Sequence, residues 1–294
     1  MTGNTGNTGN TGNTGNTGNT GNTGNIGNDG WRISDRIDLP FVTRTANGSE
    51  LGALRRTPPT YFGTRQWSAN WFAWRVLHQF VANKSDWATE ADADTDFTKI
   101  RTDLVADYDS QIANLVLAAR DERPDAIGGI LSQDVEFFTE FLAVLTVRPG
   151  SHPQTWRTLH IASLIGSFAA LYFKDKYDLP RPSQICPALL PPIPVPGHSS
   201  WPSGHATQSH LMKNLILRVF DAAGMASADK DVLSADLTVL ADVIARNREI
   251  AGLHYPADSA GGAKLADLLD GMLTASVAPL LDETITAAAD EWQP

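Results

Sequence analysis

The chain has 294 residues, of which 42% are hydrophobic and 19% are charged, with a formal net charge of −10 and one cysteine. The acidic balance argues against general nucleic-acid binding, which draws on clustered lysine and arginine side chains. The lone Cys186 excludes an internal disulfide framework. The longest apolar run, Ile161 to Phe173, is shorter than the ~18 to 20 residues that a membrane-spanning helix requires. We therefore expect a soluble protein with no membrane span and no nucleic-acid partner.

The head of the chain is a polar repeat, in which eight copies of Thr-Gly-Asn fill residues 2–25. Because these copies carry no charged or apolar side chain, they bury too little surface to offset the entropy lost on ordering. We predict a disordered head over residues 1–28. This head lacks the positive segment and the apolar segment of a signal peptide, so the expected location is the cytoplasm.

The chain beyond the head predicts one helical domain. Turn-forming residues over residues 29–60 indicate a mostly irregular lead-in. Helical periodicity begins after it, and alternating strand patterns are scarce. We therefore expect a single all-α catalytic domain over residues 61–290, because a stretch of this length can bury a sizeable core.

Two amphipathic helices are predicted in the first half of this domain, because apolar residues recur at steps of three and four over residues 67–81 and 104–115. The first pattern contains three tryptophans. We expect them to pack in the core rather than to form a substrate platform. They are Trp67, Trp71 and Trp74.

The central helices of the bundle are predicted from segments that are apolar on nearly all sides. These segments are residues 135–147 and 156–173. Helical spacing of apolar residues then continues through residues 233–244 and 265–272. The pattern is typical of a helical bundle.

A proline-rich segment interrupts the helical pattern, since residues 180–202 hold eight of the 17 prolines. Proline cannot continue a helix and stiffens a loop by fixing φ. A long stiff loop is often functional. Polar and charged motifs flank this one on both sides, and a helix is predicted to follow over residues 206–220.

Each charged residue of these motifs has an ordinary structural explanation when it is taken alone. A lysine near a helix C-terminus interacts favourably with the helix dipole, and Ser203 is a good N-cap for the helix that follows it. The joint occurrence of three motifs is what favours a site. In chain order they are Lys174-x6-Arg181-Pro182, Pro202-Ser203-Gly204-His205 and Arg248-x5-His254-x3-Asp258.

The residue types in these motifs suit a tetrahedral oxyanion. Lys174, Arg181 and Arg248 supply three positive charges, and the guanidinium groups present forked donors. The amides from Ser203 to His205 lie at a predicted helix N-terminus, where the dipole and the free N–H groups attract anions. Together these groups predict an oxyanion cradle.

Two histidines and one carboxylate supply the reactive groups. His254 can act as a nucleophile or as a metal ligand through one ring nitrogen, while Asp258 accepts a hydrogen bond from the other. This bond fixes the tautomer and raises the basicity of the ring. His205, at the start of the predicted helix, is then the candidate general acid and base.

The three motifs resemble, in order and spacing, the signature of the phosphatidic acid phosphatase type 2 and vanadium-dependent haloperoxidase superfamily. The resemblance covers roughly residues 150–265 and implies an all-α helical bundle of the acid phosphatase and vanadium haloperoxidase type. One position departs from the family pattern, because Asn247 stands where serine usually precedes the arginine. Asparagine still offers a hydrogen-bonding side chain, so we expect the cradle itself to be retained.

The resemblance implies one of two chemistries at the same residues. In the phosphatases, the position of His254 attacks phosphorus to give a phosphohistidine, and that of His205 protonates the leaving alcohol. In the haloperoxidases, vanadate occupies the cradle as the cofactor, with the position of His254 as the vanadium ligand. Hydrogen peroxide then oxidises a halide with assistance from the position of His205, and an organic acceptor is halogenated.

We expect the vanadium-dependent haloperoxidase chemistry, because the segment from Arg181 to Ala206 resembles soluble bacterial haloperoxidase-like proteins. His198 matches a position where algal bromoperoxidases also have a histidine that tunes the vanadium site, which makes it a candidate for tuning the halide preference. The short chain favours the alternative, a soluble acid phosphatase with no cofactor that hydrolyses phosphate monoesters. A third hypothesis is an inactive oxyanion-binding protein. The oligomeric state is left open by the sequence.

Overall fold

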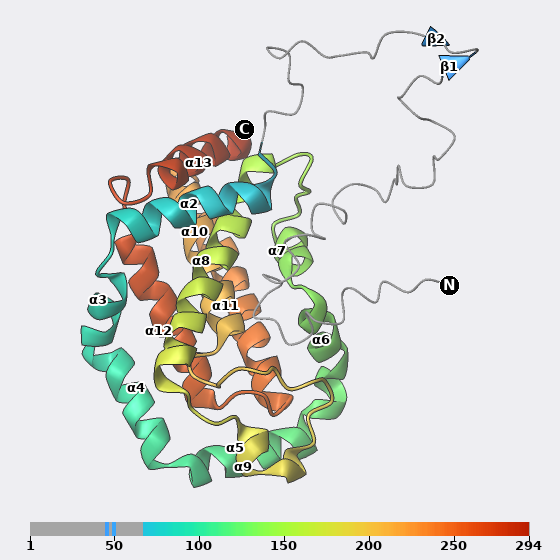
Figure 1. The fold of residues 1–294 in the computed structure, drawn as a ribbon, viewed down its shortest axis with the longest axis vertical. Coiled ribbons are helices and arrows are strands. Elements are labelled where there is room, and N and C mark those ends of the chain that lie inside the picture. Colours follow the sequence, from blue (N-terminus) through green and yellow to red (C-terminus); the bar gives the residue numbers. More distant parts are fainter. Residues whose placement is uncertain (1–44, 47–48, 51–66, 294) are drawn as a thin grey trace.

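The computed structural model describes residues 45–46, 49–50 and 67–293 (Figure 1). The predicted disordered head and most of the predicted lead-in lie outside the described residues. Within the lead-in, strands β1 (Thr45–Ala46) and β2 (Ser49–Glu50) pair antiparallel. From residue 67 onward the regular elements are helices, which confirms the all-α class expected from the sequence.

The helices follow one another with short connections. In chain order they are α2 (Ala69–Asn83), α3 (Trp87–Ala93), α4 (Thr95–Ala106), α5 (Tyr108–Asp121), α6 (Arg123–Val135), α7 (Phe138–Val144), α8 (Pro153–Tyr177), α9 (Pro182–Ile185), α10 (Gly204–Ala222), α11 (Ser227–Ile250), α12 (Pro256–Met272) and α13 (Pro279–Ala289). Two short 3-10 turns, η3 (Pro187–Leu189) and η4 (Asp290–Trp292), complete the list.

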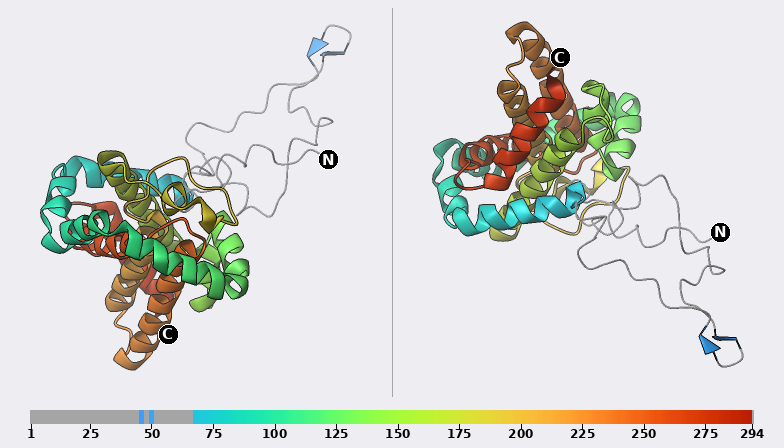
Figure 2. Two further views of the ribbon diagram at one scale, coloured as in Figure 1. Left: turned by 90° about the horizontal axis from the view of Figure 1, so that it is seen from below. Right: turned by 90° about the horizontal axis from the view of Figure 1, so that it is seen from above.

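Helix α10 lies in the middle of the bundle and packs against α8, α11, α12 and α13 (Figures 1 and 2). Its first nine residues, from Gly204 to Met212, are all buried. One hydrophobic cluster of buried side chains extends from Phe72 in α2 to Ala288 in α13. The N-terminus of α10, where the predicted cradle begins, is therefore enclosed by other helices.

Helix α8 is the second central element, and it contains the apolar segment predicted over residues 156–173. Most of its side chains from Leu159 to Phe173 are buried, because α2, α10 and α13 pack around it. Over the described residues, no helix has both the length and the apolar character needed to cross a membrane. The predictions over residues 233–244 and 265–272 are also confirmed, as parts of α11 and α12.

Two predicted helices are wrong in their extent. The pattern over residues 104–115 is divided between α4 and α5 at Asp107, whose carboxylate accepts a hydrogen bond of 3.1 Å from the backbone N–H of Ser110. The segment 135–147 holds the end of α6 and only the short helix α7. Between them Glu136 is extended, and its carboxylate caps α7 at the N–H of Thr139 (3.1 Å). In both places a local side-chain bond to the backbone replaces the helical ladder.

The tryptophan stripe is not part of the core, which corrects the prediction for α2. Trp67, Trp71 and Trp74 are 51%, 48% and 43% exposed. The buried face of α2 instead carries Phe72, Val76 and Phe80. The helix is apolar on two faces, and periodicity alone does not tell which of them meets α8.

The close approach of α12 to the N-terminus of α10 depends on Gly262. A Cβ atom at this position would lie 2.6 Å from the carbonyl oxygen of Ser203 and 2.8 Å from the Cβ of Ala206. Because the first contact is with backbone, no side-chain rotation relieves it. A residue larger than glycine here would push α12 away from the start of α10.

We predict that Gly262→Ala lowers the free energy of unfolding by about 1–3 kcal/mol, the usual cost of inserting an atom into a packed contact. Gly271→Ala in the same helix is the matched control, because nothing lies within 4 Å of its added Cβ. The control should be neutral or stabilising by up to about 1 kcal/mol. Urea unfolding followed by circular dichroism measures both. Equal stability of the two variants would contradict the proposed contact.

Candidate functional site

The fold brings the three motifs together in one buried region. Lys174 lies in the last turn of α8, Arg181 just before α9, and Arg248 in the last turn of α11. The charges of all three lower the pKa of His205 at the start of α10, and those of Lys174 and Arg181 also lower the pKa of His254. Residues far apart in the sequence thus share one electrostatic environment.

Lys174 is 1% exposed and is held by the loop that leads into α10. Its Nζ donates to the carbonyl oxygens of Ser199 (2.9 Å) and Ser200 (2.5 Å). An ammonium group has three donors, so one is left for another acceptor. Burial lowers the pKa of Lys174 well below its ordinary value, and the neighbouring charge of Arg181 lowers it further, while Asp258 acts in the opposite direction.

Arg181 is positioned by backbone carbonyls from two sides. Its Nε donates to the carbonyl oxygen of His198 and its Nη1 to that of Leu253, both at 2.9 Å. Burial lowers its pKa to about 10, with the charge of Asp258 acting in the opposite direction. The guanidinium therefore stays charged at neutral pH, and the proline-rich loop orients it.

Arg248 is fully buried and has unused donors. Its Nη2 donates to the carbonyl oxygen of Ile130 (2.6 Å), and its Nη1 lies 3.7 Å from a carboxylate oxygen of Asp134. Its Nε and Nη1 have no hydrogen-bond partner among the residues that the structure describes. Buried donors of native proteins are normally satisfied. These two donors could therefore bind an acceptor that a ligand supplies.

His254 and Asp258 form the predicted pair. The Nδ1 of His254 lies 2.9 Å from Oδ2 of Asp258, which also accepts the N–H of Tyr255 (3.0 Å) and the hydroxyl of Ser200. Since a carboxylate accepts, this network assigns the proton to Nδ1 and leaves a lone pair on Nε2. Nε2 has no hydrogen-bond partner within the described part of the chain.

The pKa shifts of this pair have clear causes. Burial lowers the pKa of His254 well below its ordinary value, and the charges of Lys174 and Arg181 lower it further. Burial raises the pKa of Asp258 to about 6, although its hydrogen bond from Ser200 and the charge of Lys174 act in the opposite direction. At neutral pH the pair is therefore a neutral imidazole beside a carboxylate.

His205 has the opposite tautomer. Its Nε2 lies 3.1 Å from the carbonyl oxygen of Gln133, which can only accept, so Nε2 carries the proton and Nδ1 holds the lone pair. Burial lowers its pKa well below the ordinary value, and the charge of Arg248 lowers it further. Both histidines of the site are thus neutral and offer a lone pair to the space among the cations.

The N-terminus of α10 has the predicted N-cap, but one of the amides predicted to bind an anion is already bonded. Ser203 is the N-cap, since its Oγ accepts the N–H of Ala206 (3.3 Å). The N–H of Ser203 donates to the carbonyl oxygen of Asp258 (2.9 Å) and is therefore already used. The amides of Gly204 and His205, in the first turn, are the ones left for an anion.

His198 lies beside the cradle, as the resemblance implied. Its carbonyl oxygen holds Arg181, and its Nδ1 lies 3.1 Å from Nη2 of the same arginine. The charge of His198 is also among the causes that lower the pKa of His254. A change in the protonation of His198 would therefore change the pKa of His254.

Helix α6 supports the site from outside the motifs, and the sequence analysis did not find it. The backbone carbonyl of Gln133 accepts a hydrogen bond from His205. The side chain of Gln133 accepts a second one at Oε1 from Nδ2 of Asn247 (2.9 Å), and its Nε2 donates a third to Glu140 (2.9 Å). Ile130, one turn earlier, holds Arg248. Two of these four contacts are made by backbone carbonyls, which leave no sequence signature. Asn247, which departs from the family pattern, thus supports His205 through Gln133.

The donor set fits an oxyanion rather than a bare metal cation. Over the described residues, no group of three or more histidine, cysteine, aspartate or glutamate side chains is arranged to hold a metal ion. The site instead combines three buried cations with two imidazole nitrogens, Nε2 of His254 and Nδ1 of His205, that have no hydrogen-bond partner among the described residues. Cations attract the oxygens of a tetrahedral anion, and an imidazole lone pair can bond to its central atom.

We predict that replacing Asp258 by Asn weakens orthovanadate binding by about 10- to 100-fold, because the neutral amide no longer fixes the tautomer of His254. The matched control is Asp242→Asn. Asp242 is an exposed carboxylate 3.5 Å from Nε2 of His210, so this variant changes a histidine–aspartate pair outside the site. Calorimetric titration measures both affinities. Equal affinities in the two variants would contradict the assigned role of Asp258.

We also predict that anion binding takes up protons. The cations help to hold the pKa of His205 and His254 low, and a bound anion offsets these charges, so the pKa of both rings rises. The affinity for sulfate should therefore fall as the pH rises, and ionisation of Asp258, whose pKa is about 6, acts in the same direction because it adds a negative charge to the site. Sulfate itself does not titrate near neutral pH. Calorimetry in two buffers of different ionisation heat measures the uptake, and a heat independent of the buffer would refute it.

Comparison of the chain with models of known protein families and with curated proteins finds no match. The resemblance to the superfamily therefore rests on the three motifs between Lys174 and Asp258. The chemistry assigned to the site rests on the contacts of its own side chains.

Proposed function

We propose that this chain is an enzyme of the vanadium-dependent haloperoxidase type, in the superfamily that also contains the type 2 phosphatidic acid phosphatases. The observation that carries the proposal is the unpartnered Nε2 of His254 in a buried site with Lys174, Arg181 and Arg248. This set of groups suits a tetrahedral anion that is bonded through its central atom to nitrogen.

Vanadate fits the residues present. The guanidinium and ammonium donors and the amides of the first turn of α10 would hold its oxygens, and Nε2 of His254 would coordinate the metal. The unsatisfied Nε and Nη1 of Arg248 supply free donors for this purpose. The hydroxyl of Ser203 also retains its own proton, because its oxygen is the acceptor in the N-cap.

Electrostatics supports the binding of an anion. Lys174 and Arg181 are buried near the carboxylate of Asp258, and Arg248 is buried near the carboxylates of Asp134 and Glu140. Buried charges are costly unless opposite charges compensate them. An anion beside these cations adds to the compensation, whereas a neutral ligand does not.

Three side chains near the vanadate site, those of His205, Asp258 and His198, would have separate roles in the reaction. Vanadate, when bound, would supply the Lewis-acidic centre at which hydrogen peroxide oxidises a halide to the species that halogenates an organic acceptor. His205 holds an available lone pair at Nδ1, so it can accept a proton from incoming peroxide. Asp258 keeps the proton of His254 on Nδ1 and so keeps Nε2 available. His198, beside Arg181, is the candidate for tuning the halide preference.

A soluble acid phosphatase is the second candidate, because the same groups suit phosphate. Nε2 of His254 would attack phosphorus, forming the N–P bond as the P–O bond to the alcohol breaks, and His205 would donate a proton to that oxygen. The low pKa of His205 in the anion-free site favours a base over an acid. The bound phosphate would have to raise this pKa before His205 could act as the acid.

The distinguishing experiment uses orthovanadate. The purified chain is dialysed with and without it, and both peroxide-dependent bromination and hydrolysis of p-nitrophenyl phosphate are measured. Vanadate activates a haloperoxidase, whereas it inhibits a phosphatase by mimicking the pentacoordinate transition state. Vanadate binding without either activity would identify the third hypothesis, an inactive oxyanion-binding protein.

We predict that His254→Ala abolishes vanadate-dependent bromination, because the variant has no nitrogen to coordinate the metal. The helical circular dichroism spectrum should be unchanged, which separates loss of the ligand from loss of the fold. Full bromination activity in this variant would refute the assignment of His254.

A further inference from the structure

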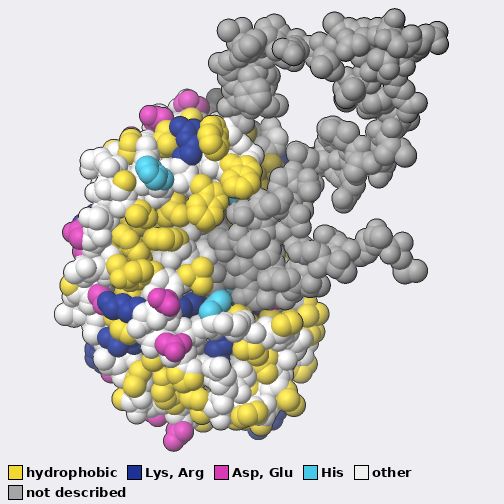
Figure 3. All heavy atoms as spheres, viewed as in Figure 1, with side chains coloured by type: hydrophobic (Ala, Val, Ile, Leu, Met, Phe, Trp, Pro, Cys, Tyr) yellow, Lys and Arg dark blue, Asp and Glu magenta, His cyan; other side chains and the backbone are white. Residues whose placement is uncertain are grey.

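A second candidate site lies on the outer face of α2, where exposed aromatic rings surround a cavity of about 460 Å³. Small-molecule sites commonly have volumes of ~300 to 1,000 Å³ and aromatic walls with a few polar groups. In Figure 3 hydrophobic side chains gather over α2, with cationic and histidine side chains beside them. The lining residues are Trp67, Trp71, Trp74, Arg75, His78, Gln79 and Leu280.

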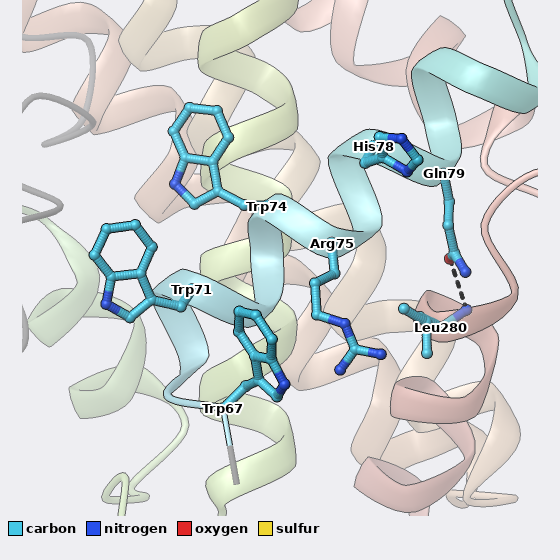
Figure 4. Close-up of a pocket in the computed structure, with 7 residues that line it drawn as sticks. All are labelled: Trp67, Trp71, Trp74, Arg75, His78, Gln79 and Leu280. Atoms are coloured by element: carbon cyan, nitrogen blue, oxygen red, sulfur yellow. Dashed lines mark hydrogen bonds between the residues drawn. The ribbon is translucent and has the colours of Figure 1, made fainter. Parts of the chain in front are cut away.

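The three indoles are the apolar part of this pocket. Each is about half exposed, although tryptophan is a costly residue to leave in water. Figure 4 shows Trp71 and Trp74 about one turn apart on α2, with Trp67 just before the helix. Flat ring surfaces of this kind suit a ligand that itself contains a ring.

Arg75 is the charged part of the pocket. Its guanidinium carbon lies 5.2 Å from the ring centres of both Trp67 and Phe72, so two aromatic rings hold it in place. Figure 4 shows Arg75 beside Trp67. It makes no hydrogen bond or ion pair with any residue that the structure describes. A positioned guanidinium with free donors is suited to a carboxylate or a sulfonate.

The neighbouring charges favour an anion as well. Arg157 in α8 lies with its guanidinium carbon 4.4 Å from the ring centre of Phe72. Burial lowers the pKa of Arg157, and the charge of Arg75 lowers it further. The negative charge of Glu291 partly compensates the positive charge of Arg157. The carboxylate of Glu291 already accepts hydrogen bonds from the backbone amides of Gln154 and Thr155. Among the described residues Arg75 has no such partner, which leaves its guanidinium available to a ligand.

The pocket is separate from the oxyanion cradle. Arg157 donates to the carbonyl oxygen of Trp67 (3.3 Å), which places the pocket near the start of α8, whereas Lys174 lies near the end of the same helix. These two positions are 17 residues apart, or about 25 Å along the helix axis. A ligand bound at α2 therefore does not contact the cradle.

We propose that this pocket binds a small organic anion that contains an aromatic ring, with the ring against the indoles and the anionic group at Arg75. The proposal is independent of the chemistry assigned to the cradle. Gln79 contributes rigidity, because its Oε1 accepts the backbone N–H of Leu280 (3.0 Å) and ties α2 to α13 (Figure 4).

The test compares 2-naphthoate with 2-naphthylmethanol, which has the same ring and no charge. Calorimetric titration of the full chain should give naphthoate an affinity at least about tenfold higher, as expected for one charge-assisted contact. Arg75→Gln should remove this preference and leave the binding of the alcohol unchanged. Trp71→Ala should weaken both ligands. Arg120→Gln is the control, because Arg120 is an exposed arginine on another helix and is paired with Asp121.

Three results would overturn the proposal. The first is equal affinity for the two ligands. The second is a naphthoate affinity that Arg75→Gln leaves unchanged, which would place the anion elsewhere, for example at the cradle. The third is a dimer in sedimentation that Trp71→Asp dissociates, because the occupant of the face would then be a second copy of the chain.

Discussion

The burial of three cations in a helical bundle is the constraint on which the structure of the site depends. Lys174 and Arg181 are 1% exposed and Arg248 is fully buried, although buried charges are among the costliest groups in a folded protein. Backbone carbonyls accept hydrogen bonds from all three, while two donors of Arg248 and one of Lys174 have no hydrogen-bond partner among the described residues. The bundle therefore keeps cationic donors available to an anion in a buried region.

Several helices position the groups that surround these cations. α10 brings its N-terminus into the buried region, where the amides of its first turn have no intrahelical acceptor, and Gly262 lets α12 approach it closely. The turn before α12 positions His254 so that its Nδ1 donates a hydrogen bond to the carboxylate of Asp258. α6 fixes His205 through a carbonyl of Gln133, which gives the two histidines opposite tautomers and leaves a lone pair on each. Backbone contacts thus set the chemistry of side chains that the motifs supply.

The two candidate ligand sites, the cradle and the pocket on α2, lie toward opposite ends of α8 and differ in burial and composition. The candidate cradle is buried and rich in charge, whereas the pocket on α2 is exposed and aromatic, and its Arg75 has no ion-pair partner among the described residues. The chain as a whole has a formal net charge of −10, yet both regions are locally cationic, because aromatic rings or backbone carbonyls hold each cationic group in place. Net charge therefore says little about which ligands a particular site accepts.

The sequence by itself determined the helical class, the helices α8, α11 and α12, and which residues make up the candidate site, because periodicity and motif spacing are local properties of the chain. Tertiary structure decided which face of α2 is buried, and it left the tryptophans outside. It also divided the segments 104–115 and 135–147, where Asp107 and Glu136 cap new helices. The support from Ile130 and Gln133 could not be read from the sequence, because a carbonyl oxygen is the same at every residue and only the packing of α6 against α11 selects these two.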